Sequence, residues 1–487
     1  MHRLRRQPAS RTRALRRGAG VLLLAIVVAG AYLVLRETGP LPRSPAQTID
    51  AGAPDPFAYS EERREQLEDR AASGLSHVLY AKSPGGIVAS ARRTARWRPL
   101  IEEVASEGGL DPDLLEAIVL LESAGRSDAV ADPQLEGAVG LTQILAGTGQ
   151  SLLDMRVEVR SSRRLTRRIA RAKRAGRESR ARALAAARRR VDERFDPRAA
   201  LEGTARYLSF ARGELGRDDL AVVSYHMGVG NLDGVIDAFG EQEAPSYARL
   251  FFDSTPARHA VAHRRLRGLG DDSSTYYWRV LAAREIMRLL GEDPAELDRR
   301  AELQTAKNSA EEVLHPDDET ERFADPDALE GAWRDGEVRT FPDAPRRTGL
   351  KRDRRMGELA RRLERGRGLY RGLRPEAYAL AAYMARMVRE GGGGRAPPTV
   401  TSTVRDQAYQ ALLARGNPEA TGGYSRHTTG WTFDVSREYA SGAQAEAFQS
   451  ALDRLTALDL IAWVREPGAI HITVSSDAEA LLPLLEE

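Results

Sequence analysis

Cysteine is absent from all 487 residues of this sequence. Its absence excludes disulfide bonds, thiol nucleophiles, iron–sulfur clusters, cysteine zinc sites and lipid anchors attached through cysteine. Lysine is almost as scarce, because only 4 of the 73 basic residues are lysine and the others are arginine. The formal net charge is only +3, so overall charge does not indicate nucleic-acid binding, and we expect none.

The residues that are present indicate a globular protein with more than one domain. Apolar residues make up 42% of the chain and charged residues 29%, which is the usual globular range. A chain of this length exceeds the size of one hydrophobic core, so we expect at least two domains.

The first 35 residues are typical of a membrane anchor. Residues 1–17 carry seven arginines and no acid, and residues 18–35 carry no charge. A helix over residues 18–35 spans about 27 Å, close to the thickness of the bilayer core. We therefore expect a single-pass protein of the cell membrane, with a cytoplasmic N-terminus and the remaining chain in the periplasm or outer wall space. A cleaved signal peptide is the alternative, because residues 29–31 are small.

Composition divides the rest of the chain into four segments. We expect a proline-rich linker over residues 36–60 and a helical domain over residues 61–290. An acidic linker over residues 291–337 then leads to a domain of mixed strands and helices over residues 338–487. Within the helical domain, residues 156–194 hold sixteen basic and four acidic residues. This insertion predicts one or two solvated helices, or else a surface that attracts anionic polymers or lipid headgroups.

A glutamate at the end of an apolar helix face is the first candidate for catalysis. Asp111 and Pro112 form a helix start, and Leu115, Ile118 and Glu122 then follow the spacing of one face. Apolar neighbours disfavour the charged form of a carboxylic acid and raise its pKa, as a general acid near neutral pH requires. The alternative is a glutamate at a frayed helix end that points into water.

Three segments support the catalytic interpretation by their order. They are LES at residues 121–123, GAVGLTQI at residues 137–144 and AVVSYHMGVG at residues 221–230. In this order they resemble the lytic transglycosylase family, whose pattern is Glu-Ser, then Gly-Leu-Met-Gln, then Ala-Tyr-Asn-Ala-Gly. The resemblance covers about residues 97–232 and implies an all-α, lysozyme-like fold. Thr142 and His226 depart from the usual methionine and asparagine.

The resemblance implies a reaction on the glycan strands of peptidoglycan. Glu122 would protonate the oxygen between N-acetylmuramic acid and N-acetylglucosamine and then, as a carboxylate, deprotonate the C6 hydroxyl, which closes on C1. The product is a 1,6-anhydro end. Gln143 and Tyr225 would orient the sugar, and Ser123 would hold the glutamate or its loop. The resemblance implies no cofactor for this domain.

Two alternating segments near the C-terminus form a second candidate site. The segments 431–435 and 470–474 alternate as strands, with Asp434 and His471 on their polar faces, and His427 lies just before the first. Two histidines and a carboxylate suit zinc with a fourth position open for water.

The segment SRHTTGWTFD, residues 425–434, resembles the VanY-type zinc D-Ala-D-Ala carboxypeptidases, whose pattern is Ser-x-His-x-x-Gly-x-Ala-x-Asp. This resemblance implies a small α+β domain with His427, Asp434 and His471 as ligands. Arg405, in the segment STVR, would grip a substrate carboxylate. The family's catalytic glutamate falls here on Gly468, so Glu466 is the candidate base. If no base acts, the domain binds peptide or metal without cutting.

The sequence thus predicts a multidomain protein with a transmembrane helix, an all-α lysozyme-like domain and a small C-terminal α+β domain. We expect a peptidoglycan lytic transglycosylase whose last domain binds or trims stem peptides. The partners would be glycan strands, stem peptides and the membrane. A hydrolytic muramidase of the goose-lysozyme type and a non-catalytic wall-binding protein are the alternatives.

Overall fold

The computed structural model describes residues 41–42, 45, 47–50, 52–269, 272–307, 309–416 and 423–486. The basic segment and the anchor predicted for residues 1–35 lie outside these ranges. Within the described ranges, no helix has both the length and the apolar character needed to cross a bilayer. The anchor therefore stays a prediction.

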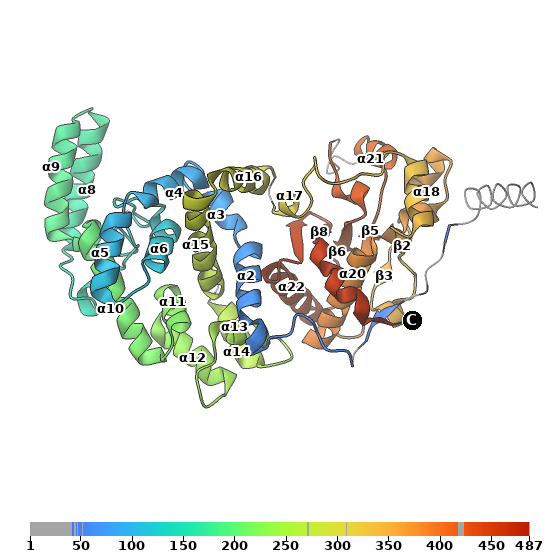
Figure 1. Cartoon of the computed structure of the whole chain (residues 1–487), viewed down its shortest axis with the longest axis horizontal. Coiled ribbons are helices and arrows are strands. Elements are labelled where there is room, and N and C mark those ends of the chain that lie inside the picture. The colour runs from blue at the N-terminus through green and yellow to red at the C-terminus, as the bar shows by residue number, and fades with distance from the viewer. Residues whose placement is uncertain are drawn as a thin grey trace, which may run out of the picture.

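The first half of the structure is built from helices joined by turns, as expected for residues 61–290 (Figure 1). In chain order the helices are η1 (Glu61–Arg63), α2 (Arg64–Gly74), α3 (His77–Lys82), α4 (Ile87–Ala95), α5 (Arg98–Gly108), α6 (Pro112–Ser123), α7 (Ala146–Ser151), α8 (Val159–Arg174), α9 (Glu178–Val191), η2 (Glu193–Phe195), α10 (Pro197–Leu215), α11 (Asp218–Met227), α12 (Val229–Phe239), α13 (Tyr247–Asp253), α14 (Ala260–Gly268), η3 (Ser273–Thr275) and α15 (Tyr276–Glu292).

Helix α6 lies at the centre of this half because it is apolar on nearly every side. Leu115, Ala117, Ile118 and Val119 are fully buried, and the helix packs against α4, α5 and α15. A helix that is apolar all round is stable only when other elements surround it. Glu122 in its last turn is therefore placed in the interior of the helical half.

The basic insertion folds into an antiparallel helical hairpin that projects from one end of the molecule (Figure 1). Helices α8 and α9 are joined through a small apolar seam made by Ile169, Ala172, Ala181 and Leu184. Most of the arginines face solvent. The insertion thus forms two solvated helices, as predicted.

The acidic stretch 291–337 differs from the loose linker that its composition predicts. It contains α16 (Pro294–Thr305), α17 (Glu311–Leu314) and α18 (Pro326–Asp335). Asp293 and Asp325 cap two of these helices by accepting bonds from backbone N–H groups, and each precedes a proline. Two of the acidic residues and the prolines that follow them are therefore helix starts, whereas residues 317–319 form a turn between α17 and α18. Helix α16 packs on α3, α4 and α15, and α17 packs on the C-terminal sheet.

The C-terminal half combines a five-stranded sheet with helices. Its remaining elements are β2 (Arg339–Thr340), α19 (Pro345–Thr348), β3 (Lys351–Arg352), η4 (Glu358–Leu363), η5 (Arg367–Tyr370), β4 (Gly372–Leu373), α20 (Pro375–Val388), η6 (Arg389–Gly393), β5 (Thr399–Ser402), α21 (Gln407–Ala414), η7 (Arg426–Thr429), β6 (Thr432–Ser436), α22 (Gly442–Ala457), β7 (Ile461–Arg465), β8 (Ala469–Val474), η8 (Ser476–Leu484) and β9 (Leu485–Glu486).

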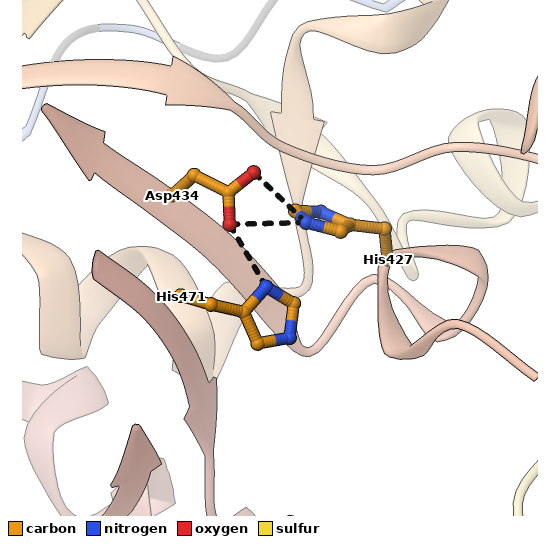
Figure 2. A group of neighbouring side chains, drawn as sticks. All are labelled: His427, Asp434 and His471. Atoms are coloured by element: carbon orange, nitrogen blue, oxygen red, sulfur yellow. Dashed lines mark hydrogen bonds and ion pairs between the residues drawn. The ribbon is translucent and has the colours of Figure 1, made fainter. Parts of the chain in front are cut away.

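The sheet has the order β3-β5-β6-β8-β7, with β3 and β5 parallel and the other pairs antiparallel. Phe433 and Val435 of β6 pack in the same apolar core as residues of α20 and α22. Alternation places Asp434 on the opposite face, where it lies directly across from His471 of β8 (Figure 2). The two strands predicted for this region are therefore present and adjacent.

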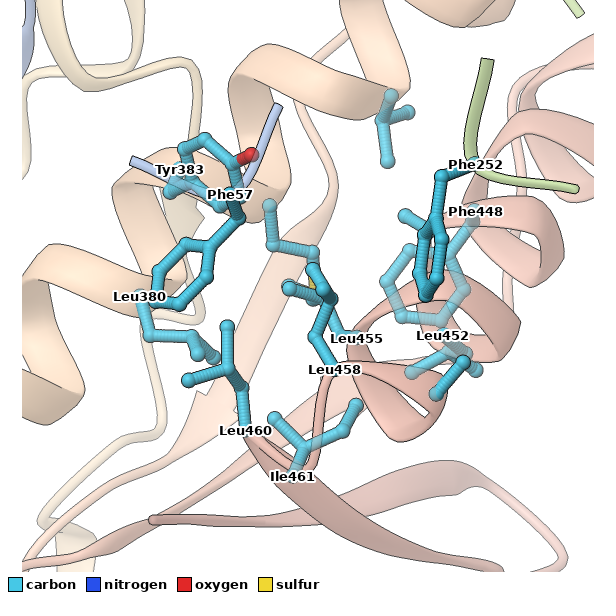
Figure 3. Close-up of a cluster of buried hydrophobic side chains, with 14 of the residues drawn as sticks. Phe57, Phe252, Leu380, Tyr383, Phe448, Leu452, Leu455, Leu458, Leu460 and Ile461 are labelled. Carbon is cyan, nitrogen blue, oxygen red and sulfur yellow. The ribbon is translucent and has the colours of Figure 1, made fainter. Parts of the chain in front are cut away.

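The two halves share one apolar core. Phe57, Phe252, Leu452 and Leu455, which come from three distant parts of the chain, gather in it (Figure 3). Arg454 of α22 also donates to the backbone oxygens of Phe252 and Phe57. The halves are thus packed against each other.

The chain before α2 is part of this assembly, although its prolines predict a free linker over residues 36–60. Strand β1 (Thr48–Ile49) pairs with β9 at the C-terminus. The hydroxyl of Tyr383 donates to Asp55 at 2.8 Å, and Phe57 is buried in the shared core. The described part of this segment is therefore docked on the C-terminal half.

Candidate functional site

Glu122 occupies the last turn of α6, and local sequence explains why the helix ends there. Asp111 caps the first turn by accepting from the N–H of Asp113, and Pro112 is the first helical residue. At the other end, Ala124 is left-handed with φ 54°, and Gly125 follows with φ 74°. A side chain at Gly125 would meet the backbone N of Thr94 at 2.6 Å, so the turn packs closely against α4.

A tyrosine from α15 holds the carboxyl of Glu122. The hydroxyl of Tyr276 donates to Glu122 Oε1 at 2.7 Å. The ring of Tyr276 is stacked near two others, with centroids 6.4 Å from Tyr225 and 5.2 Å from His226. His226 Nδ1 in turn lies 2.9 Å from Ser273 Oγ. The donor to Glu122 is therefore fixed in place by aromatic packing.

These surroundings change the acidity of Glu122. Burial raises the pKa of Glu122 to about 7, and the hydrogen bond from Tyr276 offsets part of that increase. The residue as a whole is half-buried. A carboxylic acid with this pKa is substantially protonated near neutral pH, as a proton donor must be.

Gln143 and Tyr225 lie beside each other, because the loop with Gln143 is bonded to Tyr225. The Tyr225 hydroxyl donates to the carbonyl of Thr142 at 2.7 Å and lies 3.1 Å from Thr204 Oγ1. Gln143 has a left-handed backbone, φ 54°, and its Nε2 donates to Gly140 O at 2.8 Å. The second and third segments of the sequence pattern thus meet near the ring of Tyr276.

The same loop is bonded to the base of the basic hairpin. The guanidinium of Arg194 is fully buried, pairs with Asp192 at 2.9 Å and donates to Leu135 O at 2.9 Å. A Cβ on Gly140, whose φ is 86°, would lie 1.8 Å from Arg194 O. Only glycine fits at this position, so the loop and the hairpin base form one close-packed unit.

Ser123 is oriented away from this cluster. Its side chain is buried and its hydroxyl donates to Val119 O in the preceding turn at 3.2 Å. The hydroxyl is therefore directed into the helix that carries Glu122, and the role expected for Ser123 in holding the glutamate or its loop stays a prediction.

A cleft of about 1090 Å³ also lies in the helical half, but at the opposite end of α6. It is lined by Glu68, Arg98, Glu116, Glu285 and Arg300, among others, and not by Glu122. The chemistry of the Glu122 cluster, and not the size of a cavity, identifies the candidate active site.

Tyr276 was missed by sequence reasoning. It is the first residue of an aromatic run, Tyr276, Tyr277 and Trp278, and begins a helix after the turn η3. That run was the available signal, but aromatic residues at a helix start are ordinary core residues more often than site residues.

The second cluster brings together the three residues expected to bind zinc. One potential ligand atom from each of His427, Asp434 and His471 lies within 4.8 Å of the others (Figure 2). His427 Nε2 is 3.1 Å from Asp434 Oδ2, and His471 Nδ1 is 2.9 Å from Asp434 Oδ1. His427 comes from η7, Asp434 from β6 and His471 from β8.

The donor set fits a divalent metal such as zinc, because the outer nitrogen of each imidazole already has a partner. His427 Nδ1 lies 2.8 Å from the carbonyl oxygen of Thr403, so it is the protonated nitrogen of a neutral ring. His471 Nε2 lies 3.3 Å from Glu311 Oε2. Each ring therefore directs its other nitrogen towards Asp434, as metal-binding histidines do.

The charges of this cluster are strongly coupled. Burial, reinforced by Arg405, lowers the pKa of His427 to about 4. Burial would also lower the pKa of His471, but its bonds to Asp434 and Glu311 raise it to about 10. Although burial opposes it, the two histidines hold the pKa of Asp434 well below its usual range. Without a metal, His471 is thus the protonated ring.

Arg405 lies at the edge of the cluster. Its guanidinium donates to Ser402 Oγ at 2.7 Å and to Gln410 Oε1 at 2.8 Å, and it is 3.5 Å from Asp434 Oδ2. The position suits a residue that binds a carboxylate next to the metal ligands.

Glu466 follows β7 in the turn to β8, and its backbone N donates to Ala469 O at 3.0 Å. Burial lowers the pKa of Arg405, and the negative charges of Asp434 and Glu466 oppose this effect. The role of Glu466 as a base stays a prediction.

Comparison with known proteins supports part of this description. No family model matches the chain. A segment of 69 residues, 14% of the chain, is 33% identical to the endo-type membrane-bound lytic murein transglycosylase A of Salmonella paratyphi B, and the proteins of that name from Salmonella enteritidis PT4 and Salmonella gallinarum match equally. The matched segment is 32% of each relative, so the chain spans about a third of the curated relatives it matches.

Proposed function

We propose that this protein is a peptidoglycan lytic transglycosylase with Glu122 as its acid and base. The observation that carries the proposal is the hydrogen bond of 2.7 Å from Tyr276 to the carboxyl of Glu122, whose burial raises its pKa to about 7. The partial similarity to lytic murein transglycosylases supports the same substrate.

The first step is cleavage of the bond between N-acetylmuramic acid and N-acetylglucosamine. Glu122 donates its proton to the glycosidic oxygen, which leaves as a hydroxyl, and the positive charge that develops at C1 is stabilised by the N-acetyl group of the muramic acid. Tyr276 keeps the carboxyl in one orientation while it changes charge. As the anion forms, the bond from Tyr276 becomes a stronger, charge-assisted bond.

The second step uses the same residue in its ionised form. The carboxylate of Glu122 removes the proton from the C6 hydroxyl, and the oxygen closes on C1 to give a 1,6-anhydro end. Glu122 regains in this step the proton that it lost in the first, so the enzyme returns to its starting state. One carboxyl suffices, whereas hydrolases commonly use two.

The test uses the full-length protein incubated with purified peptidoglycan, with the released fragments analysed by mass spectrometry. We expect anhydro ends from the parent protein and none from Glu122→Gln, which keeps the shape of the side chain without its proton. Glu116→Gln is the matched control, because Glu116 lies on the same helix and pairs with Arg98 at 2.9 Å. Reducing ends would instead indicate a muramidase, and cleavage by Glu122→Gln would overturn the assignment.

The convergence of His427, Asp434 and His471 favours a second function in the C-terminal half, the binding or trimming of stem peptides at a zinc centre. These three residues would hold the ion, and zinc supplies a Lewis acid and an activated water when bound. Arg405 would bind the terminal carboxylate of the peptide, with Glu466 as the candidate base. The predicted anchor would hold both sites at the outer face of the membrane.

Metal analysis of the purified protein tests the second function. We expect one zinc per chain in the parent protein and loss of zinc in His427→Ala. His77→Ala is the control, because His77 lies on α3 and bonds to Gln304, outside the cluster. A parent protein that binds no zinc under any loading condition would rule out the metal centre.

A further inference from the structure

A carboxylate from outside the sheet contacts one of the two histidines of the second cluster. Glu311, the first residue of α17, places Oε2 at 3.3 Å from His471 Nε2 and accepts from Thr473 Oγ1 at 3.3 Å. It is buried, with 6% of its surface exposed. The residue belongs to the acidic stretch that composition alone predicts to be a linker.

The position of Glu311 relative to the imidazole defines what it can do. His471 Nδ1 faces Asp434 at 2.9 Å, whereas Nε2, on the other side of the ring, faces Glu311. Glu311 therefore lies away from the space between His427, Asp434 and His471, and it is neither a fourth ligand nor a base there. Its bond instead keeps a proton on Nε2 and leaves the lone pair of Nδ1 for a cation.

The same short segment supports the other histidine through Arg426. The guanidinium of Arg426 is fully buried and pairs with Glu311 at 3.4 Å and with Glu312. Arg426 directly precedes His427 in η7. Buried ion pairs of this kind contribute little net stability, because desolvation offsets their attraction. The ion pairs of Arg426 instead fix the position of the segment that carries His427.

We propose that Glu311, at the start of α17, is the positioning residue of His471 in the metal centre. This inference rests on the zinc centre proposed above. It makes metal binding depend on the connection between the halves, because α17 follows α16, which packs on α3, α4 and α15 of the helical half.

The matched pair Glu311→Ala and Glu312→Ala tests this role in the full-length protein. Both residues lie on α17, both are buried to the same extent, and both pair with Arg426 and Lys307. Only Glu311 contacts His471. We expect zinc affinity, measured by competition with a chelator, to fall about 10- to 100-fold in Glu311→Ala and less than threefold in Glu312→Ala.

A second variant guards against misfolding. In Glu311→Gln the amide oxygen can still accept from Nε2, so the loss of affinity should be smaller than in Glu311→Ala, and thermal unfolding of the metal-free proteins shows whether each variant folds. Equal losses in Glu311→Ala and Glu312→Ala, or unchanged affinity in Glu311→Ala, would overturn the positioning role. A parent protein without zinc affinity would overturn the metal centre itself, which is a distinguishable result.

A separate observation concerns the basic hairpin of α8 and α9. Its ion pairs involve Arg163, Lys173 and Arg189. Ten other exposed arginines between residues 159 and 191, in a stretch that is fully described, have no carboxylate within 4.0 Å. They are Arg160, Arg164, Arg167, Arg168, Arg171, Arg174, Arg177, Arg180, Arg182 and Arg190.

The positive charges of these arginines are not neutralised by carboxylates, so they repel one another. Arg160, Arg164 and Arg168 repel one another at i, i+4 spacing, and only a small apolar seam holds the two helices together. The base of the hairpin is bonded to the loop that carries Gln143, through Arg194. Figure 1 shows the hairpin projecting from the end of the helical half that contains α5 and α10.

We infer that the hairpin binds an extended anionic polymer and holds it beside the Glu122 site. A membrane surface fits less well, because a helix that lies in a bilayer interface needs an exposed apolar face. The apolar residues of this hairpin are used in the seam, and the large exposed hydrophobic residues of the described chain, such as Phe210 and Val261, lie elsewhere.

Binding of fluorescent polyphosphate by the full-length protein tests the inference, with a quadruple variant at Arg164, Arg167, Arg168 and Arg171, each changed to glutamine. The control removes the same charge from exposed arginines of the other half, at Arg346, Arg361, Arg362 and Arg395. We expect at least tenfold weaker binding and a shallower salt dependence for the hairpin variant only. Equal weakening in both variants, or a hairpin effect confined to vesicles of phosphatidylglycerol, would overturn the inference.

Discussion

The hydroxyl of Tyr276 and the carboxyl of Glu122 are separated by 154 residues in the sequence and joined by a hydrogen bond of 2.7 Å in the fold. The bond connects the end of α6 to the start of α15, which pack against each other along the centre of the helical half. It orients the acid and moderates the increase in its pKa that burial causes. Several expectations depend on this pair and on the contacts around it.

Tyr276→Phe should shift the pH dependence of glycan cleavage. The first step requires protonated Glu122, so activity should fall as the pH rises through about 7. The bond from Tyr276 lowers the pKa of Glu122, so its removal moves this limb to higher pH, while the loss of orientation reduces the rate by about tenfold. The rate of fragment release between pH 5 and pH 9 measures both effects. Tyr277→Phe is the control, and an unchanged profile in Tyr276→Phe would contradict the assigned role.

Glu122→Gln should be more stable than the parent protein at alkaline pH. The pKa of Glu122 is raised from 4.5 in the unfolded chain to about 7 in the fold. The stability associated with the protonated acid is therefore complete below pH 4.5 and is lost as the pH rises through about 7. The difference should reach about 3 kcal/mol at pH 8 and fall below about 0.5 kcal/mol at pH 4.5. Thermal unfolding at the two pH values decides this, and a variant less stable at pH 8 would speak against it.

Gly140→Ala should destabilise the loop of Gln143. The new methyl group would overlap Arg194 O, and the φ of 86° disfavours any residue with a Cβ. We expect a loss of about 2 kcal/mol or more in the free energy of unfolding, together with reduced cleavage. Gly147→Ala, where no atom lies within 4 Å of the added carbon, should be neutral or slightly stabilising. Chemical denaturation of both variants provides the comparison.

Arg405→Lys should weaken the binding of peptides that end in a free carboxylate. Ser402 and Gln410 already orient the guanidinium of Arg405. A guanidinium can form two parallel hydrogen bonds with one carboxylate, and an ammonium group cannot. We expect a loss of at least tenfold for a peptide ending in D-Ala-D-Ala and little change for its C-terminal amide, measured by calorimetry. If both peptides lose affinity equally, the arginine does not read the carboxylate.

The parts of the site that follow from local sequence could be predicted. Asp111 and Pro112 begin the helix of Glu122, and the alternation around Asp434 and His471 assigns both to polar strand faces. These features depend on periods of two or three to four residues, which a sequence displays directly.

The parts that were missed depend on contacts between distant segments. Tyr276 reaches Glu122 from another helix, and Glu311 reaches His471 across more than a hundred residues. Composition was also misleading, because the acidic residues and prolines of residues 291–337 suggested a linker, whereas Asp293 and Asp325 within this stretch begin helices. The contact between Tyr276 and Glu122 and the contact between Glu311 and His471 leave no periodic pattern in the sequence, so only the three-dimensional structure reveals them.

The apolar core shared by the two halves fixes the separation between their candidate sites. Phe57, Phe252 and Leu452 are all buried in this core, so a change in the angle between the halves would expose apolar side chains to water. The distance between the two clusters is therefore fixed by the fold, unlike that between two domains joined by a flexible linker. In the proposed function, a glycan strand bound at Glu122 would present to the second cluster only those stem peptides that lie at one fixed distance along the strand, so this spacing would select among them.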